Sequence, residues 1–522
     1  MIDGSMQAFA LTLDKFLDHA AKWRPDGQVV TARDGGRIDR IGYADLRERS
    51  VRVSAVLAGM GVKTGEHVAT LAWNSQAHVE AWYAIMGMGA ICHTLNPRVT
   101  AEQLATMVVQ SEARILIASV DLAPLAKQIM AGAPGVTRLL IIDGEAEGGE
   151  ALEPMVVAER GSVPWGQFDE TAPCGLCFTS GTTGAPKGVT YTHRSSYLHT
   201  LRALQADSMA ITREDAVLAV VPMFHANAWG LPFATPAVGA KLVLPGRHTD
   251  GASLARLIAA ENVTMGVGVP TVWLSLIVYL EANGGVLPSL KRIMVGGAPM
   301  PPALMERIEQ RLGVKVQTSW GMTELSPCGT LAPLNAPSVA AISGRPAVGV
   351  DLLLTDADGV ALPEQRGVVG HLKVKGPSVA RQYFKAAAPA LDADGWFDTG
   401  DLAIIDEGGA LTLAGRSKDL IKSGGEWINP VDIEQIIGAD PSVGMVAVIA
   451  RVDDKWGERP LLVVEPRQGH AVENGALLKS LKGKVADWWI PDRVVQVEAM
   501  PLAATGKIDK TRLRADYGQA LG

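Results

Sequence analysis

A stretch rich in glycine and hydroxyl side chains, at 177–189, has the composition of a loop that holds phosphate groups. It reads Cys-Phe-Thr-Ser-Gly-Thr-Thr-Gly-Ala-Pro-Lys-Gly-Val and follows a short apolar run. Glycines let backbone N–H groups converge on one small space, hydroxyls add donors, and Lys187 adds a positive charge. A Walker A loop does not fit, because Lys187 follows Pro186 and precedes Gly188. The stretch predicts a polyphosphate-binding loop, with a mobile polar turn as the alternative.

Further clusters of charged and hydroxyl residues beside glycine follow along the chain. Taken alone, each has an ordinary explanation, such as a helix cap, an Asp-Gly turn or a solvated basic loop. These clusters are Trp320-Gly-Met-Thr-Glu324, Trp396-Phe-Asp-Thr-Gly-Asp401, Gly415-Arg-Ser-Lys-Asp419, Lys422-Ser-Gly-Gly-Glu426 and Pro501-Leu-Ala-Ala-Thr-Gly-Lys507.

With these motifs in this order, the chain resembles the acyl-adenylate-forming superfamily, which includes acyl-CoA synthetases, adenylation domains of peptide synthetases and firefly luciferase. The resemblance covers roughly 11–513. It implies that ATP is held through the phosphate loop and through the 320–322 segment, which borders the adenine and the acyl tunnel. The residues concerned are Thr179, Ser180, Gly181, Thr182, Thr183, Gly184, Lys187, Trp320, Gly321 and Met322.

The same resemblance assigns the remaining groups around the nucleotide. Thr323 would contact phosphate, Glu324 would ligate Mg²⁺, Asp401 would hold the ribose hydroxyls, and Arg416 would assist at the ribose or phosphate. Trp320 stands where the family commonly has tyrosine, which keeps a stacking surface but loses the hydroxyl.

The C-terminal motifs imply a domain that serves two half-reactions in turn. Lys418 matches the family's hinge, about which the small domain would swing between adenylation and thioester formation. Lys507 would bridge the substrate carboxylate and the α-phosphate during adenylation. In the second state Lys422 would serve thioester formation, and Gly424 and Gly425 would let pantetheine of coenzyme A pass close to the backbone.

The segment 222–232 is similar to a subgroup of medium- and long-chain fatty-acyl-CoA synthetases and methylmercaptopropionate-CoA ligases. There an aromatic residue matching Trp229 gates the acyl tunnel and His225 lines the acid's entry, although a lone histidine beside aromatics is more often a packed core residue. An apolar pocket contributes ~0.8 kcal/mol per buried methylene, which favours longer chains without choosing sharply among them. Aryl, arylalkanoic and methylthio-alkanoic acids stay open. Val267, Val269, Gly296, Gly297, Trp320 and Met322 would complete the pocket.

Two small departures from the family pattern lie in the 370–383 region. Gly370-His371 replaces the family's Gly-Glu, and Arg381-Gln382-Tyr383 replaces the usual Gly-Tyr. Neither is expected to touch the chemistry.

Other functions fit the motifs less well. A peptide-synthetase module would need a carrier domain beyond Lys507 and an acidic residue for the substrate amine near 223–230 or 266–269, and neither is seen. A non-catalytic regulator would have lost Lys507 or Glu324, and a P-loop NTPase would show a Walker context. Luciferase chemistry is not excluded by motifs. The sequence favours an AMP-forming acyl-CoA ligase whose partners are a carboxylic acid, ATP and CoA, with Mg²⁺.

Composition limits the kinds of partner and the cellular location that we expect for this protein. The 522 residues carry a net charge of −7 and no basic run, which argues against nucleic-acid binding. The N-terminus is no signal peptide and the apolar runs are too short to span a bilayer, so we expect a cytoplasmic protein without stable membrane insertion. A homodimer stays open. The pair Cys174-x-x-Cys177 lacks a second pair at zinc spacing and is interpreted as buried structural thiols.

The elements that must position these residues are those of an α/β protein. Apolar strands at 67–72, 90–93, 114–118 and 138–143 alternate with helical segments such as 77–87, which predicts parallel sheets with helices. From about 344 strands shorten and Asp-Gly turns multiply, which predicts a β subdomain at about 344–415 within an N-terminal domain of 1–417. A small mobile α+β domain, 418–522, would follow, with a helix at 475–485 and a strand at 493–498.

Overall fold

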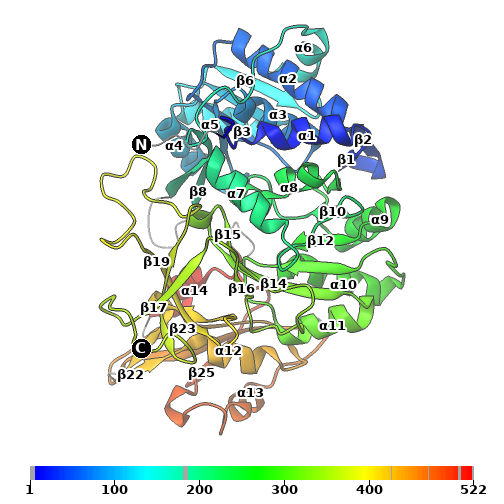
Figure 1. Ribbon diagram of the computed structural model, residues 1–522. Helices are drawn as coiled ribbons and strands as arrows, with labels where there is room; N and C mark the ends of the chain where they lie inside the picture. The colour runs from blue at the N-terminus through cyan, green and yellow to red at the C-terminus, as the bar shows by residue number, and fades with distance from the viewer. Residues whose placement is uncertain (1–5, 180–185, 425, 468, 504–506, 520–522) are drawn as a thin grey trace.

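The computed structural model describes residues 6–179, 186–424, 426–467, 469–503 and 507–519 (Figure 1). In this part of the chain the strands form four sheets, two large and mainly parallel and two smaller. The blue N-terminal elements lie at the top of Figure 1, the green ones below them, and the orange and red C-terminal elements at the bottom.

The first sheet has the strand order β7-β6-β5-β3-β4-β8-β9 and is parallel except for the β8–β9 hairpin. Its central strands are apolar and buried on both faces, as expected for parallel strands covered by helices. The strands are β3 (His67–Leu71), β4 (Ile91–Thr94), β5 (Ile115–Ser119), β6 (Arg138–Ile142), β7 (Glu150–Ala151), β8 (Pro173–Thr179) and β9 (Lys187–Thr192). The helices from this region are α2 (Tyr43–Gly59), α3 (Gln76–Gly87), α4 (Ala101–Ser111), α5 (Ala123–Gly132) and α6 (Leu152–Ala158).

The second sheet has the order β16-β15-β14-β13-β12-β10-β11-β1-β2, parallel from β14 to β1 and antiparallel at both edges. The strands are β1 (Gln28–Ala32), β2 (Ile38–Gly42), β10 (Ala216–Ala219), β11 (Lys241–Leu244), β12 (Met265–Gly268), β13 (Arg292–Val295), β14 (Lys315–Gly321), β15 (Cys328–Leu331) and β16 (Arg345–Pro346). The helices are α1 (Asp14–Trp23), α7 (His193–Ala203), α8 (Leu231–Val238), α9 (Gly251–Glu261), α10 (Pro270–Asn283) and α11 (Pro302–Leu312).

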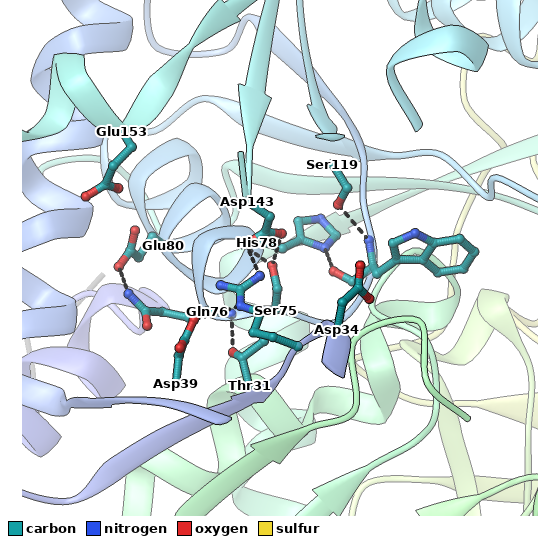
Figure 2. A network of polar contacts seen from close by, with 12 residues as sticks. Thr31, Asp34, Asp39, Ser75, Gln76, His78, Glu80, Ser119, Asp143 and Glu153 are labelled. Carbon is teal, nitrogen blue, oxygen red and sulfur yellow. Dashed lines mark hydrogen bonds and ion pairs between the residues drawn. The ribbon is translucent and has the colours of Figure 1, made fainter. Parts of the chain in front are cut away.

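A polar network joins the two large sheets beside their shared apolar core. Ser75 Oγ donates a 2.7 Å hydrogen bond to Asp143 Oδ2, and the Gln76 backbone N–H donates to Thr31 Oγ1 at 2.9 Å. Figure 2 shows Thr31, Ser75 and Asp143 lying together, and Arg33 forms an ion pair with Asp143 there. The first turn of α3 is therefore fastened to both sheets.

The two smaller sheets form the C-terminal third of the chain. The antiparallel sheet β17-β18-β19-β20 lies within 351–416, and the sheet β22-β21-β24-β23, with β25 beside β24, lies within 421–496. The strands are β17 (Asp351–Thr355), β18 (Val369–Lys375), β19 (Phe397–Ile405), β20 (Leu411–Arg416), β21 (Ile421–Ser423), β22 (Glu426–Ile428), β23 (Val443–Asp453), β24 (Gly457–Pro466) and β25 (Arg493–Gln496). The helices are α12 (Pro430–Gly438), α13 (Asn474–Ser480) and α14 (Lys510–Tyr517). Short 3₁₀ turns are η1 (Asp34–Gly36), η2 (Val120–Leu122), η3 (Ala226–Gly230), η4 (Thr323–Leu325), η5 (Ser417–Asp419) and η6 (Asp487–Trp489).

The predicted α/β class is confirmed by the parallel sheets with helices, and the part predicted as a small α+β domain is rich in strands. Local expectations differ at element ends. The helix predicted at 475–485 ends at Ser480, because the chain then turns through Gly483 at φ +74° and a bridge between Lys482 and Val485. Cys174 and Cys177 are free and buried in β8, as predicted. Burial raises the pKa of both thiols, to about 12 and about 11, so neither is a reactive thiolate. No helix in the described part of the chain is long and apolar enough to cross a bilayer.

Candidate active site

The described ends of the predicted phosphate loop lie at the β8–β9 hairpin. Thr179 pairs with Lys187 across the two strands, and Lys187 is exposed there. The loop residues between them that were predicted to hold phosphate lie outside the described residues; they are Ser180, Gly181, Thr182, Thr183 and Gly184. The hairpin thus fixes where the loop begins and ends.

A tyrosine links this hairpin to the predicted metal ligand. The Tyr383 hydroxyl donates to Glu324 Oε1 at 2.8 Å, and Lys187 Nζ lies 4.8 Å from the centre of the Tyr383 ring. The phenol stays protonated and able to donate, because burial and the neighbouring Glu324 carboxylate raise its pKa. Tyr383 therefore contacts two of the predicted site residues.

This contact differs from the expectation that the 381–383 departure lies away from the chemistry. The segment after β18 folds back over the site, where the Ala380 N–H donates to the Glu324 carbonyl at 2.7 Å and the Phe384 N–H donates to the Gly188 carbonyl at 2.7 Å. The spacing of residues in the sequence did not predict that this segment folds back over the site. The one feature that could have indicated it is an aromatic residue, Tyr383, inside a polar loop.

The loop that carries Thr323 and Glu324 is held by its backbone. Tyr191 donates its hydroxyl to the Thr323 carbonyl at 2.8 Å. Just before it, Gly321 has no room for a side chain, since a Cβ there would lie 2.3 Å from the Pro327 carbonyl oxygen. Thr323 and Glu324 are both buried, and the Met322 side chain is partly buried against the core of the antiparallel sheet.

Glu324 is suited to a magnesium ion that is shared with phosphate. The described residues contain no cluster of three or more histidine, cysteine or acidic groups that could cage a metal. Mg²⁺ usually takes one or two carboxylates together with waters and substrate phosphate oxygens. A single carboxylate with one oxygen fixed by Tyr383, close to Lys187 at the phosphate loop, fits that kind of binding.

Asp401 and Arg416 face each other across β19 and β20, where they are register partners. Arg416 Nε lies 2.8 Å from Asp401 Oδ1, and Trp320 Nε1 donates to Asp401 Oδ2 at 3.0 Å. The Asp401 side chain is only 4% exposed, and this burial raises its pKa although Arg416 and the Trp320 hydrogen bond oppose the shift.

Lys507, from the C-terminal domain, comes to the same place. Its ammonium interacts electrostatically with Asp401, Glu324 and Arg416, and it also acts on His225. Protein packed around the side chain lowers the pKa of Lys507, Arg416 lowers it further, and the two carboxylates oppose the shift. Lys507 is nevertheless exposed at the surface. The structure thus brings the predicted metal, ribose and cation residues together.

His225 lies on a loop that Asn74 fastens to β10. The Asn74 amide donates to the carbonyls of Ala219 and Val221 at 2.9 and 2.8 Å, and its oxygen accepts from the Met223 N–H at 2.7 Å. Burial lowers the pKa of His225 to about 4, with Lys507 adding to the effect, so the imidazole is neutral at physiological pH. A small cavity beside the ring is lined by Thr94, Asn96, Val99, Met107, Phe178, Phe224 and His225.

The next four residues form a left-handed turn that presents Trp229. The φ angles of Ala226, Asn227, Ala228 and Trp229 are 44°, 51°, 46° and 52°, a conformation that costs L-residues roughly 1–2 kcal/mol each. The Trp229 indole covers Gly296, where a Cβ would lie 2.9 Å from Trp229 Cη2.

Part of the rest of the predicted pocket lies near this indole. Val269 and Trp229 both lie beside Gly297, within 4 Å of where its Cβ would be, and Val267 belongs to the large core cluster against which Trp229 packs. The Val267 carbonyl also accepts from the Val220 N–H at 2.9 Å. Gly296, Gly297 and Val269 are therefore brought close to the Trp229 indole.

The residues predicted for thioester formation are held within their own domain. Lys422 donates its backbone N–H to Glu458 Oε2 at 2.8 Å, and its ammonium lies 5.4 Å from the centre of the Trp427 ring. The Gly424 N–H donates to the Trp456 carbonyl at 2.8 Å. Gly425 lies outside the described residues. The contacts of Lys422 and Gly424 are thus made within their own part of the chain.

The residues on either side of Lys418 are fastened to different parts of the molecule. Ser417 Oγ donates to the Gly400 carbonyl at 3.3 Å and lies 3.2 Å from His371 Nδ1, both in the antiparallel sheet. Asp419 forms a 2.6 Å ion pair with Arg514 of α14. His371, which belongs to the other departure from the family pattern, thus lies beside the predicted hinge.

Comparison with protein families shows where the chain belongs. A family model described as AMP-binding enzyme matches residues 17–384, and a model of the AMP-binding enzyme C-terminal domain matches 432–507. The chain belongs to the AMP-binding enzyme family. Its members include a medium-chain-fatty-acid–CoA ligase of Ectopseudomonas oleovorans, 38% identical over 99% of this chain and 98% of that protein.

Two further proteins show the range of similarity. A 3-methylmercaptopropionyl-CoA ligase of Ruegeria pomeroyi is 39% identical over 99% of both chains. Among solved structures, ATP-bound MatB from Rhodopseudomonas palustris superposes with a TM-score of 0.86 at 26% identity, over 97% of this chain and 99% of that one.

Proposed function

We propose that this AMP-binding enzyme is an ATP-dependent acyl-CoA ligase. In the first half-reaction an oxygen of the acid's carboxylate forms a bond to the α-phosphorus of ATP, and the bond to pyrophosphate breaks. In the second, the sulfur of coenzyme A bonds to the acyl carbon and AMP leaves. The observation that supports this most directly is the electrostatic interaction of Lys507 with the Asp401 and Glu324 carboxylates.

The cluster suits the first half-reaction. Two anions must approach each other, so cations fixed where charge develops contribute most of the stabilisation. Lys507 would lie between the carboxylate and the α-phosphate, and Arg416 would add charge beside the ribose. Glu324 would hold Mg²⁺, which would screen the negative charge of the phosphates, and Thr323 would contact phosphate oxygen. Neutral His225 would border the acid without adding a charge.

The second half-reaction requires another arrangement of the domains. Lys422, Gly424 and Gly425 would face the site only after the C-terminal domain rotates, and pantetheine would then pass the glycines. We place the domain boundary at Lys418, with domains at 1–417 and 418–522. The opposite anchors of Ser417 and Asp419 support this boundary.

The acid is proposed to be a medium- or long-chain fatty acid. The apolar residues around Trp229 support this, and so do the activities named for the relatives from Ectopseudomonas oleovorans and Ruegeria pomeroyi. An aryl, arylalkanoic or methylthio-alkanoic acid is the alternative. The cytoplasmic location and a homodimer stay predictions.

Pyrophosphate release across a panel of acids tests the proposal. The panel holds straight-chain acids from two to sixteen carbons, methylthio-propionate, aryl-propionates and cinnamates, each with ATP and Mg²⁺ and with or without CoA. We expect turnover that requires both an acid and CoA. Release that needs an acid but ignores CoA would assign another acceptor, and no release with any acid would contradict the ligase function.

A further inference from the structure

The indole N–H of Trp320 is directed at the carboxylate proposed to hold the ribose. Trp320 lies at the end of β14 and is 5% exposed, with its ring in the core cluster of the antiparallel sheet beside Leu354 and Phe397. Most of its ring is therefore covered by protein. Its one polar atom, Nε1, donates to Asp401 Oδ2 at 3.0 Å.

The hydrogen bond from Trp320 leaves acceptor positions on Asp401 free for a ligand. An ionised carboxylate offers about four lone-pair sites, two on each oxygen. Trp320 takes one on Oδ2 and Arg416 takes one on Oδ1. One site remains on each oxygen, which matches the two vicinal hydroxyls of a ribose. The two donors also fix the rotation of the carboxylate, because each holds a different oxygen.

We propose that Trp320 is a positioning residue that sets the carboxylate of Asp401 for the ribose hydroxyls, so that it acts on ATP through this hydrogen bond rather than through its ring face. This inference rests on the proposed function, in which Asp401 binds the ribose. It predicts that Trp320 and the ribose hydroxyls are energetically coupled, whereas a stacking residue would be coupled to the adenine.

Binding of ATP, 2′-deoxy-ATP and 3′-deoxy-ATP, measured by calorimetry with the full chain, tests the coupling. In Trp320→Phe the hydrogen bond to a charged group is lost, so we expect the Kd for ATP to rise about tenfold. The two deoxy analogues already lack one partner of Asp401, so the same change should weaken them by less than about threefold. Equal weakening of all three nucleotides would overturn the proposal.

Two controls separate this effect from damage to the fold. Trp82→Phe removes an indole N–H from a hydrogen bond of the same length, to His78 Nε2 at 3.0 Å, at a fully buried position of α3. It should leave all three Kd values unchanged. If Trp320→Phe does not fold, the ¹⁵N–¹H signal of the Trp320 indole in the wild type serves instead. That signal should shift more with ATP than with either deoxy analogue, and equal shifts would contradict the proposal.

Results that contradict the proposed function differ from those that contradict the role of Trp320. A wild-type protein that binds none of the three nucleotides would overturn ATP-dependent ligation itself. A wild type that binds ATP and both analogues with equal affinity would remove the ribose role of Asp401, and with it the role of Trp320.

Discussion

The hydroxyl of Tyr383 donates a 2.8 Å hydrogen bond to Oε1 of Glu324, while the ring of the same tyrosine lies 4.8 Å from Lys187 Nζ. One side chain thus touches the proposed metal ligand and the lysine at the end of the phosphate loop. These three residues come from widely separated parts of the sequence, so the contact exists only in the folded chain.

Removing this hydroxyl should weaken the use of magnesium. In Tyr383→Phe the Glu324 carboxylate loses a fixed donor, and we expect the half-saturating Mg²⁺ concentration for pyrophosphate release to rise roughly tenfold, the equivalent of one hydrogen bond to a charged group. A magnesium titration of the first half-reaction measures this. Tyr197→Phe, a half-buried tyrosine stacked on Phe16, is the control and should titrate as the wild type does. An unchanged titration in Tyr383→Phe would show that the contact does not orient Glu324.

Loss of the cation at 507 should separate the two half-reactions. In the proposed mechanism Lys507 faces the charge that develops in the transition state, so acyl-adenylate formation in Lys507→Ala should fall by about 10²–10³-fold. Thioester formation from supplied acyl-adenylate and CoA should be spared, because in the same proposal that step uses the other arrangement of the domain. Lys479→Ala, at an exposed position of α13, should change neither rate. Equal loss of both half-reactions in Lys507→Ala would contradict the two-arrangement account.

Restricting rotation at residue 418 should slow thioester formation and spare adenylation, the opposite of the effect expected for Lys507→Ala. A proline there fixes φ and limits the residue before it. Lys418→Pro should keep adenylation within about threefold of the wild type and slow thioester formation by at least ~100-fold, since product of the first step would stay trapped. Lys418→Ala, which leaves the torsions free, should carry out both steps. Single-turnover assays of each half-reaction distinguish these results.

The indole of Trp229 should limit the length of the acid. Trp229→Ala opens the space over Gly296, and we expect the preference between a long and a short acid to shift by about tenfold toward the longer one. Ratios of kcat/KM across the straight-chain panel measure the shift. Trp23→Ala removes an exposed tryptophan at the end of α1 and should leave the ratios as they are. The same ratios in Trp229→Ala as in the wild type would mean that Trp229 is not a gate.

Stability should fall in mildly acidic solution, and His78 is one cause. Burial lowers its pKa to about 4, and its neutral Nε2 accepts the Trp82 N–H. The unfolded chain takes up the proton near pH 6.5, so the stability that neutral His78 contributes is complete above that pH and is lost as pH falls toward 4. At pH 5 the loss is about 2 kcal/mol.

Denaturant unfolding at pH 7 and pH 5 checks this. In His78→Gln the difference between the two pH values should shrink by roughly that amount, because glutamine cannot take up the proton. His19→Gln, at an exposed position, should keep the wild-type difference. A wild-type free energy of unfolding that does not fall at pH 5 would contradict the neutral state of the buried histidine.

Much of the fold could be predicted from the sequence, because buried parallel strands leave continuous apolar runs. The run at 67–72 became β3 and the helical pattern at 77–87 became α3. The helix predicted at 475–485 was too long, since apolar spacing alone did not register the turn at Gly483. Periodicity reports which residues are buried and says less about where a backbone turns.

The candidate site was predictable where a motif is continuous in the chain. Thr323 with Glu324, and Asp401 with Arg416, could be found from spacing and family resemblance, and the structure brings them together with Lys507. The contacts of Tyr383 and of the Trp320 N–H were not predictable, because each depends on two segments that meet only after folding. Residue type shows which side chains can donate hydrogen bonds, but only the tertiary structure shows which acceptors they bond to.

The anchors on either side of Lys418 also bear on the effective concentration of Lys507 at its target. Ser417 is tied to β19 and Asp419 to α14, so under the proposed boundary Lys418 would be the tether between the parts that carry Asp401 and Lys507. A tether this short would confine Lys507 to a small volume around its target and give it a high effective concentration, which falls once a linker exceeds the span it must cover. Each added residue would dilute Lys507 relative to its partners while leaving every contact in the cluster chemically intact.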